Sequence, residues 1–163
     1  MLDFRLFQTD SSEDAETLLG LFGQAREYFL LCEGRLQTFE EAVNDLAALP
    51  PGKQLRDKCY GGYWRDGVLV GCMDLVRGYP EPDIAYLGLL LFGESHQGQG
   101  YGVAAMAHIS QLARLWGCTK LRLAVIDKNV RGLQFWQRQG FVELYRKPKP
   151  EFTGDAIVMQ RAL

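Results

Sequence analysis

Three glycines stand close together in Gln97-Gly98-Gln99-Gly100-Tyr101-Gly102, between an apolar segment and an amphipathic one. Glycine has no Cβ, so the backbone can turn tightly and come close to a ligand. If a helix begins near Gly100, the amides of this loop point into one concavity, where the helix dipole adds partial positive charge. This arrangement predicts a diphosphate site. The alternative is a strand-to-helix turn that uses glycine for geometry alone.

Two other phosphate-binding motifs do not fit the loop. No Gly-Lys-Ser or Gly-Lys-Thr occurs in the chain, which excludes a nucleoside-triphosphate loop. The last step in the spacing Gly98-x-Gly100-x-Gly102 is too short for the dinucleotide fingerprint.

The loop and a second motif together resemble the GNAT family of N-acetyltransferases. Gln97, Gly100 and Gly102 match the acyl-CoA signature of that family, which is Gln or Arg, two residues of any type, Gly, any residue, then Gly or Ala. The second motif follows as Asn129-x-x-Gly132-x-x-Phe135-Trp136-x-x-x-Gly140-Phe141. The order of elements resembles the family fold over nearly the whole chain, which implies a single domain over residues 1–163.

This resemblance implies that the chain binds acetyl-CoA as a co-substrate. The backbone of the central strand should pair with the pantetheine arm, the loop amides should hold the pyrophosphate, and an asparagine should hydrogen-bond the pantetheine arm. The residues expected to bind acetyl-CoA are Leu90, Leu91, Phe92, Gln97, Gly98, Gln99, Gly100, Tyr101, Gly102, Val103 and Asn129.

Trp136 departs from the family pattern, because the second residue of the aromatic pair is often a tyrosine that protonates the departing thiolate. An indole N–H donates a hydrogen bond but is not a useful acid near neutral pH. Either another hydroxyl serves, from Tyr86, Tyr101 or Tyr145, or hydrogen bonds alone stabilise the thiolate. A thiol of pKa about 8.5 is a fair leaving group without an acid.

Transfer to an amine also requires a proton acceptor, because an alkylamine of pKa about 10.4 is mostly ammonium at neutral pH. Asp74 and Glu33 are the candidates that we favour, and Glu94 and His96 are alternatives. Asp74 lies among apolar residues, where burial of a charged carboxylate is unfavourable. Its presence there therefore indicates either a catalytic role or a structural hydrogen bond.

Tyr28 and Tyr79 would join these carboxylates in an acidic, aromatic acceptor pocket. The acceptor predicted from such a pocket is a small cationic amine. As an alternative to this pocket, the carboxylates lie in solvent and the two tyrosines pack in the core. As alternatives to a small amine, the acceptor is a protein N-terminus or lysine, or the chain is a non-catalytic acyl-CoA sensor.

The rest of the sequence must build the elements that position these residues. After a first strand over residues 4–8, two helices are expected, one running to about Cys32 and one from a capping box at Thr38–Glu41. A hairpin around Asp66-Gly67 and an apolar central strand over residues 84–92 follow. Strands and helices then alternate, which predicts an α/β (α+β) fold, a mixed sheet between helices in three layers. The resemblance adds that the central strand splays from its neighbour.

Composition narrows the partners. The chain has 18 Lys+Arg against 20 Asp+Glu and a net charge of −2, which favours neither nucleic acid nor an anionic membrane as partner. Its four cysteines form no paired motif and it has two histidines, so neither a metal site nor disulfides are expected. We read no signal peptide and expect a cytoplasmic protein. Edge strands would allow a homodimer.

Overall fold

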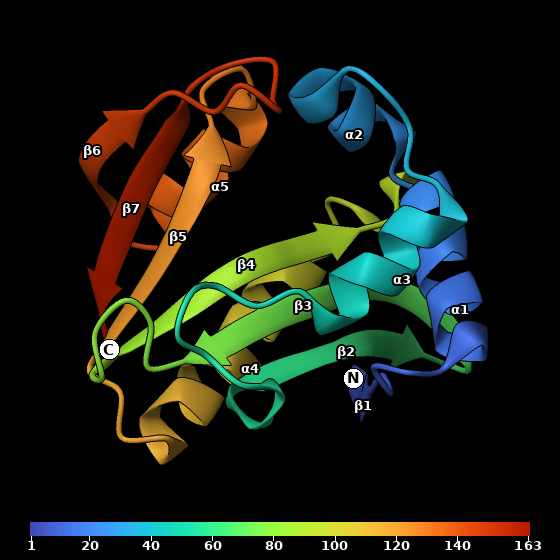
Figure 1. Ribbon diagram of the computed structural model, residues 1–163, viewed down its shortest axis with the longest axis horizontal. Helices are drawn as coiled ribbons and strands as arrows, with labels where there is room; N and C mark the ends of the chain where they lie inside the picture. Colours follow the sequence, from blue (N-terminus) through green and yellow to red (C-terminus); the bar gives the residue numbers. More distant parts are fainter.

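The computed structural model describes all residues, 1–163, and contains one seven-stranded mixed sheet between two layers of helices (Figure 1). The strand order is β1-β2-β3-β4-β5-β7-β6. The strands are β1 (Asp3–Leu6), β2 (Lys58–Arg65), β3 (Val68–Arg77), β4 (Ile84–Phe92), β5 (Lys120–Ile126), β6 (Val142–Lys147) and β7 (Ala156–Ala162). The helices are α1 (Ser12–Gly23), α2 (Arg26–Glu33), α3 (Phe39–Ala47), α4 (Tyr101–Leu115) and α5 (Val130–Arg138). None of them is both long enough and apolar enough to span a membrane.

The core lies on both faces of the sheet. On one face, Ala105 and Ile109 of α4 pack with Leu121 and Leu123 of β5, all of them buried. On the other face, Leu18 of α1 and Leu46 of α3 belong to a second cluster that includes Cys72 of β3. Burial of one such leucine stabilises the fold by roughly 1.5–3 kcal/mol. These two layers confirm the predicted three-layer architecture.

The centre of the sheet opens between β4 and β5. These parallel strands pair only from Ile84↔Lys120 to Leu87↔Leu123 and diverge beyond that point (Figure 1). On its other side β4 pairs with β3, where Leu75↔Leu87 is followed by Asp74↔Leu89, so that Gly88 is an extra residue. Such a bulge bends its strand and increases the local twist. The bulge therefore lies where β4 leaves β5.

One predicted element is wrong. The first helix does not continue to about Cys32 but breaks between α1 and α2. At the break, the carbonyl of Gln24 accepts a hydrogen bond from the Glu94 N–H at 2.8 Å, and the Glu94 carboxylate accepts from the Glu27 N–H at 3.3 Å. The segment after β4 thus fixes the break, and α2 leaves the direction of α1 toward the connection between β6 and β7 (Figure 1).

The other predicted elements agree with the structure to within a few residues. The capping box of α3 is present, with Thr38 and Glu41 as its partners. The hairpin between β2 and β3 turns at Asp66 and Gly67, which both have positive φ. Gly34 ends α2 in the left-handed conformation, which is common at helix C-termini.

Candidate functional site

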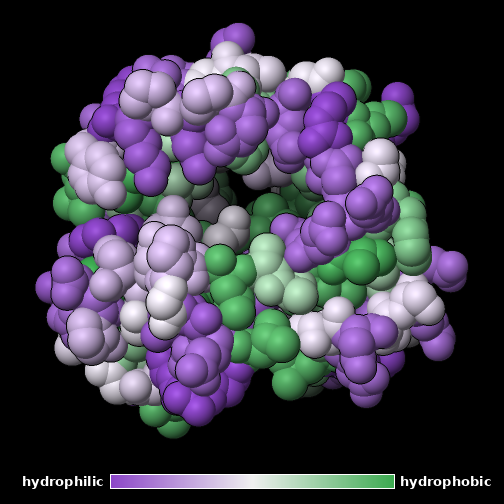
Figure 2. All heavy atoms as spheres, in the orientation of Figure 1, coloured by the Kyte–Doolittle hydropathy of each residue, from purple (hydrophilic) through white to green (hydrophobic).

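A cleft of about 770 Å³ lies where β4 and β5 diverge. Its walls come from β4, β5, the glycine-rich loop with the first turn of α4, α5, α2 and the β6–β7 connection. Gly88 and Ala124 are exposed although they lie in the middle of central strands. The volume is in the range of small-molecule sites. Figure 2, drawn in the orientation of Figure 1, shows a hollow in the middle of the molecular surface, with hydrophobic residues along its edge.

The glycine-rich loop offers free backbone donors to this cleft. Gly98 and Gly100 have φ of 74° and 84°, and Gly100 is the N-cap of α4 without a side-chain cap. None of the six amides from Gly98 to Val103 donates a hydrogen bond within the protein. Unpaired N–H groups at a helix N-terminus form an anion site. The loop thus has the donors that a pyrophosphate requires.

Side chains in and around the loop fix its shape. Gln97 Nε2 donates to the Phe92 carbonyl at 3.0 Å, and Gln99 Nε2 donates to the Ser95 carbonyl at 3.0 Å. A Cβ on Gly102 would stand 3.0 Å from the Phe135 ring, so this glycine lets α4 pack closely against α5. Gln97 and Gln99 therefore hold the loop by their side chains. The Gln97 N–H donates to the Glu94 carbonyl, so the amides left for a ligand begin at Gly98.

Asn129 lies at the opposite wall of the cleft as the N-cap of α5. Its Oδ1 accepts from the Gly132 N–H at 3.0 Å. A Cβ on Gly132 would collide with the Asn129 side chain, which explains the glycine of the second motif. The Asn129 Nδ2 makes no hydrogen bond within the protein. Two donors of one side chain in a fixed orientation therefore remain for a ligand, and its pantetheine role stays a prediction.

Of the candidate acids, Tyr86 and Tyr101 line the cleft and Tyr145 does not. Burial raises the pKa of Tyr86 to about 12. Trp136 also lines the cleft, with its ring 4.9 Å from that of Phe135 and 5.5 Å from that of Phe141. Its environment is that of a packed aromatic side chain.

Replacement of Trp136 by phenylalanine is expected to leave the shape of the pH–rate profile unchanged, because the indole transfers no proton. The smaller ring leaves unfilled space and should lower the free energy of unfolding by about 1 kcal/mol. Steady-state rates across pH, together with thermal unfolding, check both parts. Loss of the alkaline limb in the variant would mean that Trp136 has a role in proton transfer.

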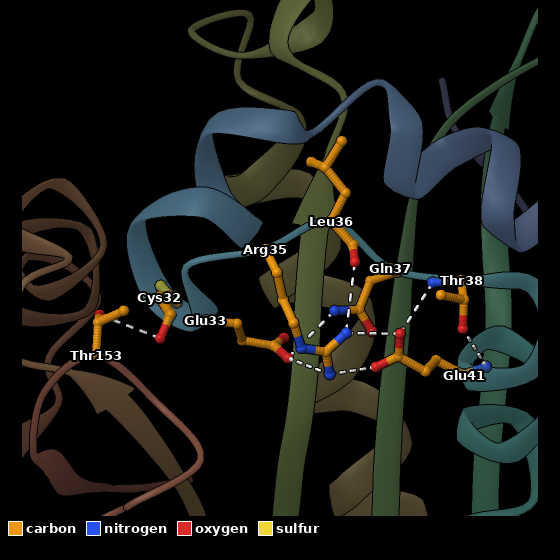
Figure 3. Close-up of polar contacts among 8 residues, drawn as sticks. All are labelled: Cys32, Glu33, Arg35, Leu36, Gln37, Thr38, Glu41 and Thr153. Atoms are coloured by element: carbon orange, nitrogen blue, oxygen red, sulfur yellow. Dashed lines mark hydrogen bonds and ion pairs between the residues drawn. The ribbon is translucent and has the colours of Figure 1, made fainter.

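The far side of the cleft has a roof made by α2 and residues 148–155. Thr153 Oγ1 donates to the Leu31 carbonyl at 2.6 Å. The Thr153 N–H donates to the Cys32 carbonyl at 2.8 Å, and Figure 3 shows Thr153 beside Cys32. Cys32 also packs with Ile126 of β5 and Ala156 of β7 in a small buried cluster. These contacts tie α2 across the open ends of the strands, so the cleft is covered on this side.

The roof supplies lining residues that the sequence did not identify. Glu27 and Cys32 come from α2, and Lys149 and Phe152 come from the β6–β7 connection. Lys149 forms an ion pair with Glu151 at 3.0 Å. The segment 148–155 contains two prolines, which are typical of a loop, and α2 has helical spacing. Neither reveals that the two segments meet.

Asp74 lies under the cleft on β3, opposite β4, with 14% of its side chain exposed. Its Oδ2 accepts from Lys58 Nζ at 2.9 Å, whereas its Oδ1 is buried without a hydrogen-bond partner. Burial raises the pKa of Asp74 to about 6, against the opposing effect of Lys58. A carboxyl group with a pKa near neutral pH suits a proton acceptor.

The structure does not bring the other predicted acceptor residues together. Tyr28 lines the cleft, whereas Tyr79 and Glu33 do not, and Asp74 lies behind Gly88 rather than in the cleft wall. Figure 3 shows Glu33 turned toward Arg35 and Gln37, with Gln37 Nε2 3.1 Å from its Oε1. Burial raises the pKa of Glu33, while Gln37 and Arg35 act in the opposite direction. Roles for Glu33 and Tyr79 stay predictions.

The two alternative bases also have defined places. Glu94 caps the start of α2 through the bond to the Glu27 N–H described above. His96 lines the cleft beside the loop. Nowhere do three or more His, Cys, Asp or Glu side chains gather in a group able to hold a metal ion.

Known proteins with the same architecture are numerous. The family model described as the acetyltransferase (GNAT) family matches residues 24–141. An acetyltransferase from Thermus thermophilus is 30% identical, has a TM-score of 0.83, and is matched over 100% of this chain and 97% of its own. No curated protein sequence matches the chain.

Two more distant structures were solved in complex with coenzyme A. The PaiA N-acetyltransferase from Thermoplasma acidophilum is 17% identical, with a TM-score of 0.71 over 100% of this chain and 99% of that one. An aminoglycoside acetyltransferase is 16% identical, with a TM-score of 0.75, and the match covers 99% of this chain and 95% of that one. At these identities the likeness shows the fold alone.

Proposed function

The chain belongs to the GNAT family of acetyltransferases, and from this premise we propose that it transfers the acetyl group of acetyl-CoA directly to the amine of a small molecule. The single observation that carries the proposal is the roofed cleft between β4 and β5, with unpaired amides at one end and Asp74 beneath its floor.

The cleft has the features that acetyl-CoA requires. The six unpaired amides from Gly98 to Val103 suit the pyrophosphate. Beyond Leu87 the edge of β4 that faces β5 has no strand partner, which suits an extended pantetheine arm. Coenzyme A in two proteins of the same fold supports this assignment. The thioester would then lie near Gly88, where β4 and β5 separate.

The proposed reaction is a direct transfer. The acceptor ammonium loses one proton to a carboxylate, for which Asp74 is our candidate, and the amine nitrogen attacks the thioester carbonyl carbon. Backbone N–H groups of β4 stabilise the tetrahedral oxyanion. The C–S bond then breaks, and the thiolate takes the second proton of the nitrogen, either directly or through Tyr86 or Tyr101. No covalent intermediate on the protein is needed.

The roof favours a small acceptor over a protein surface. A protein N-terminus or lysine would need a groove open enough for a chain, whereas Thr153 ties α2 to the β6–β7 connection over this end of the cleft. The wall near the roof is mainly apolar, with Tyr28, Leu31 and Phe152 beside one carboxylate, Glu27. An amine on an apolar or aromatic body fits these walls better than a polycation, which narrows the acceptor expected from the sequence.

Replacement of Thr153 by valine is expected to raise KM for the acceptor about fivefold while leaving the Kd of acetyl-CoA unchanged. The variant keeps the shape of the side chain but loses one hydrogen bond, worth about 1 kcal/mol, so the roof loosens only over the acceptor. Thr17→Val is the control, because Thr17 Oγ1 donates to the Glu13 carbonyl at 3.0 Å far from the cleft. An equal effect in both variants would show that the roof does not act on the acceptor.

Thiol release from acetyl-CoA tests the proposal as a whole. We would measure it with aliphatic amines, arylalkylamines, aminoglycosides, polyamines and peptides with free N-termini. Turnover is expected with small amines, most strongly with those on apolar bodies. Turnover with peptides alone would favour the protein-acceptor alternative, and acetyl-CoA binding without turnover on any amine would favour a sensor.

A further inference from the structure

Gly88 differs from the other glycines within the strands. A Cβ on Gly61, Gly62 or Gly71 would collide with neighbouring atoms, so packing alone explains those three. At Gly88 the nearest atom would be Asp74 Oδ2 at 3.3 Å, and the φ of Gly88 is not in the left-handed region. A small side chain would thus nearly fit. Neither collision nor backbone conformation requires glycine at this position.

The missing side chain leaves Asp74 next to the cleft. Gly88 is exposed and lines the cleft, and its Cβ would also stand 3.6 Å from Asp74 Cγ. Of the two carboxylate oxygens, Oδ1 is buried without a partner, so Oδ2 is the one that faces the gap. The bulge and the missing Cβ together give this buried carboxylate a path to the place where β4 and β5 separate.

Lys58 holds the same oxygen from the other side. Its side chain is only 2% exposed, and its Nζ donates to Asp74 Oδ2 at 2.9 Å and also to the Ala48 carbonyl. The ammonium lies over the Tyr60 ring, 5.2 Å from its centroid. A lysine buried to this extent is held in one orientation and carries a charge that needs a nearby carboxylate.

We propose that Gly88 is the opening through which Asp74 Oδ2 takes the proton of the acceptor ammonium, and that Lys58 is the positioning residue that keeps Asp74 ionised for this step. The inference rests on the proposed function. One N–H bond of the ammonium breaks, and its proton binds Asp74 Oδ2 directly or through one water in the gap. The freed lone pair attacks the thioester, and Asp74 later returns its proton to solvent.

Several groups face Asp74, and they set the pH range of the step. Lys58 favours the ionised carboxylate, whereas Asp45 of α3 disfavours it. The nearby Tyr60 and Cys72 are buried and Cys59 is half-buried. Loss of solvation raises the pKa of each of them, so they stay neutral around pH 6. Because the base must be ionised, kcat/KM is expected to rise with pH through about 6 and then level off.

The first test is a double-mutant cycle on Gly88→Ala and Asp74→Asn. The added methyl separates Oδ2 from the amine, so Gly88→Ala should lower kcat/KM at least about tenfold, with the Kd of acetyl-CoA unchanged. In the Asp74→Asn background the same methyl should have little further effect, because no proton is transferred there. Additive losses, or full activity of Gly88→Ala, would overturn the role of Gly88.

The second test uses Lys58→Met, with Lys53→Met as its control. Lys53 is also largely shielded from solvent, with 18% of its side chain exposed, and it pairs with Asp57 at 3.5 Å. Removal of the Lys58 charge should raise the pKa of Asp74, so the acidic limb of kcat/KM moves up by about one pH unit or more. Lys53→Met should not move it. An unmoved limb in a folded Lys58→Met protein would overturn the positioning role, and Lys58→Gln replaces it if the methionine variant does not fold.

A titration without substrate separates this inference from the proposed function. In protein labelled with ¹³C at the aspartate carboxyls, the Asp74 resonance is assigned by its loss in Asp74→Asn. It should titrate near pH 6 and at higher pH in Lys58→Met. A normal, low pKa would overturn the inference even in an active enzyme. Failure of the wild type to acetylate any amine would instead overturn the proposed function and leave the titration result standing.

Discussion

Replacement of Gly100 by valine is expected to lower the affinity for acetyl-CoA at least about a hundredfold. Gly100 caps α4 with φ of 84°, a conformation that a β-branched residue rarely adopts, and a Cβ there would meet nothing within the protein. The valine would therefore turn the amides away from the pyrophosphate and place a side chain in its path. Each hydrogen bond to a charged group contributes about 1.5–3 kcal/mol, so loss of two accounts for the effect.

Gly117→Val is the matched control, because it imposes the same strain at the other end of the same helix. Gly117 has φ of 81°, also with nothing near its Cβ position, and it lies just beyond α4. Calorimetric titration with acetyl-CoA, together with thermal unfolding of both variants, separates binding from stability. If both variants lost stability equally and both kept wild-type affinity, the loop amides would not be the pyrophosphate site.

Replacement of Asp74 by asparagine is expected to lower kcat/KM for the best amine well over tenfold, with the affinity for acetyl-CoA intact. Asparagine keeps the shape of the side chain but does not accept a proton at neutral pH. The acidic limb of the pH–rate profile, expected near the Asp74 pKa of about 6, should disappear as well. Rates measured between pH 5 and 9, with saturating acetyl-CoA, check both effects.

Asp57→Asn is the control for loss of a buried carboxylate. Asp57 is also buried and pairs with Arg77 at 3.2 Å, but unlike Asp74 it does not lie against Gly88 of the cleft wall. It should lower stability without moving the acidic limb. An Asp74→Asn protein with full activity and an unchanged limb would remove Asp74 from the reaction and leave the acetyl-CoA half of the site untouched.

The geometry of the glycine-rich loop and of Asn129 was predictable because its signals are local. The loop from Gln97 to Gly102 and the cap at Asn129 depend on short stretches of backbone, and glycine or a capping residue at a helix end has a defined geometric meaning. The central strand and the hairpin followed in the same way from their apolar pattern and turn residues. The structure brings these segments to one cleft.

The acceptor side was much less predictable, because it depends on contacts between distant segments. The break after α1 is set by Gln24 and Glu94, and the roof by Thr153 and the end of α2. Neither contact has a signature in the local sequence. Glu33 was expected at the acceptor but lies with Arg35 and Gln37, because its direction depends on how α2 crosses the sheet (Figure 3).

Gly88 shows a further limit of local patterns. In the sequence it is one glycine in an apolar strand. Strict alternation of side chains along that strand would place Leu87 and Leu89 on the same face of the sheet, which differs from the structure. The bulge against β3 shifts the alternation, so that Leu87 and Leu90 pack on one face and Leu89 on the other. Only the pairing of β4 with both neighbours reveals that this residue lies at the point of divergence.

An amide-resolved NMR titration with acetyl-CoA tests the central claim most directly, since the chain of 18.4 kDa is suited to it. The claim is that acetyl-CoA binds in the cleft between β4 and β5, along the loop amides and the part of β4 that does not pair with β5. The largest shifts are expected at Gly98 to Val103 and at Gly88 to Phe92, with no change on β1 or β6. Unchanged loop amides, with the largest shifts at another surface, would contradict the account.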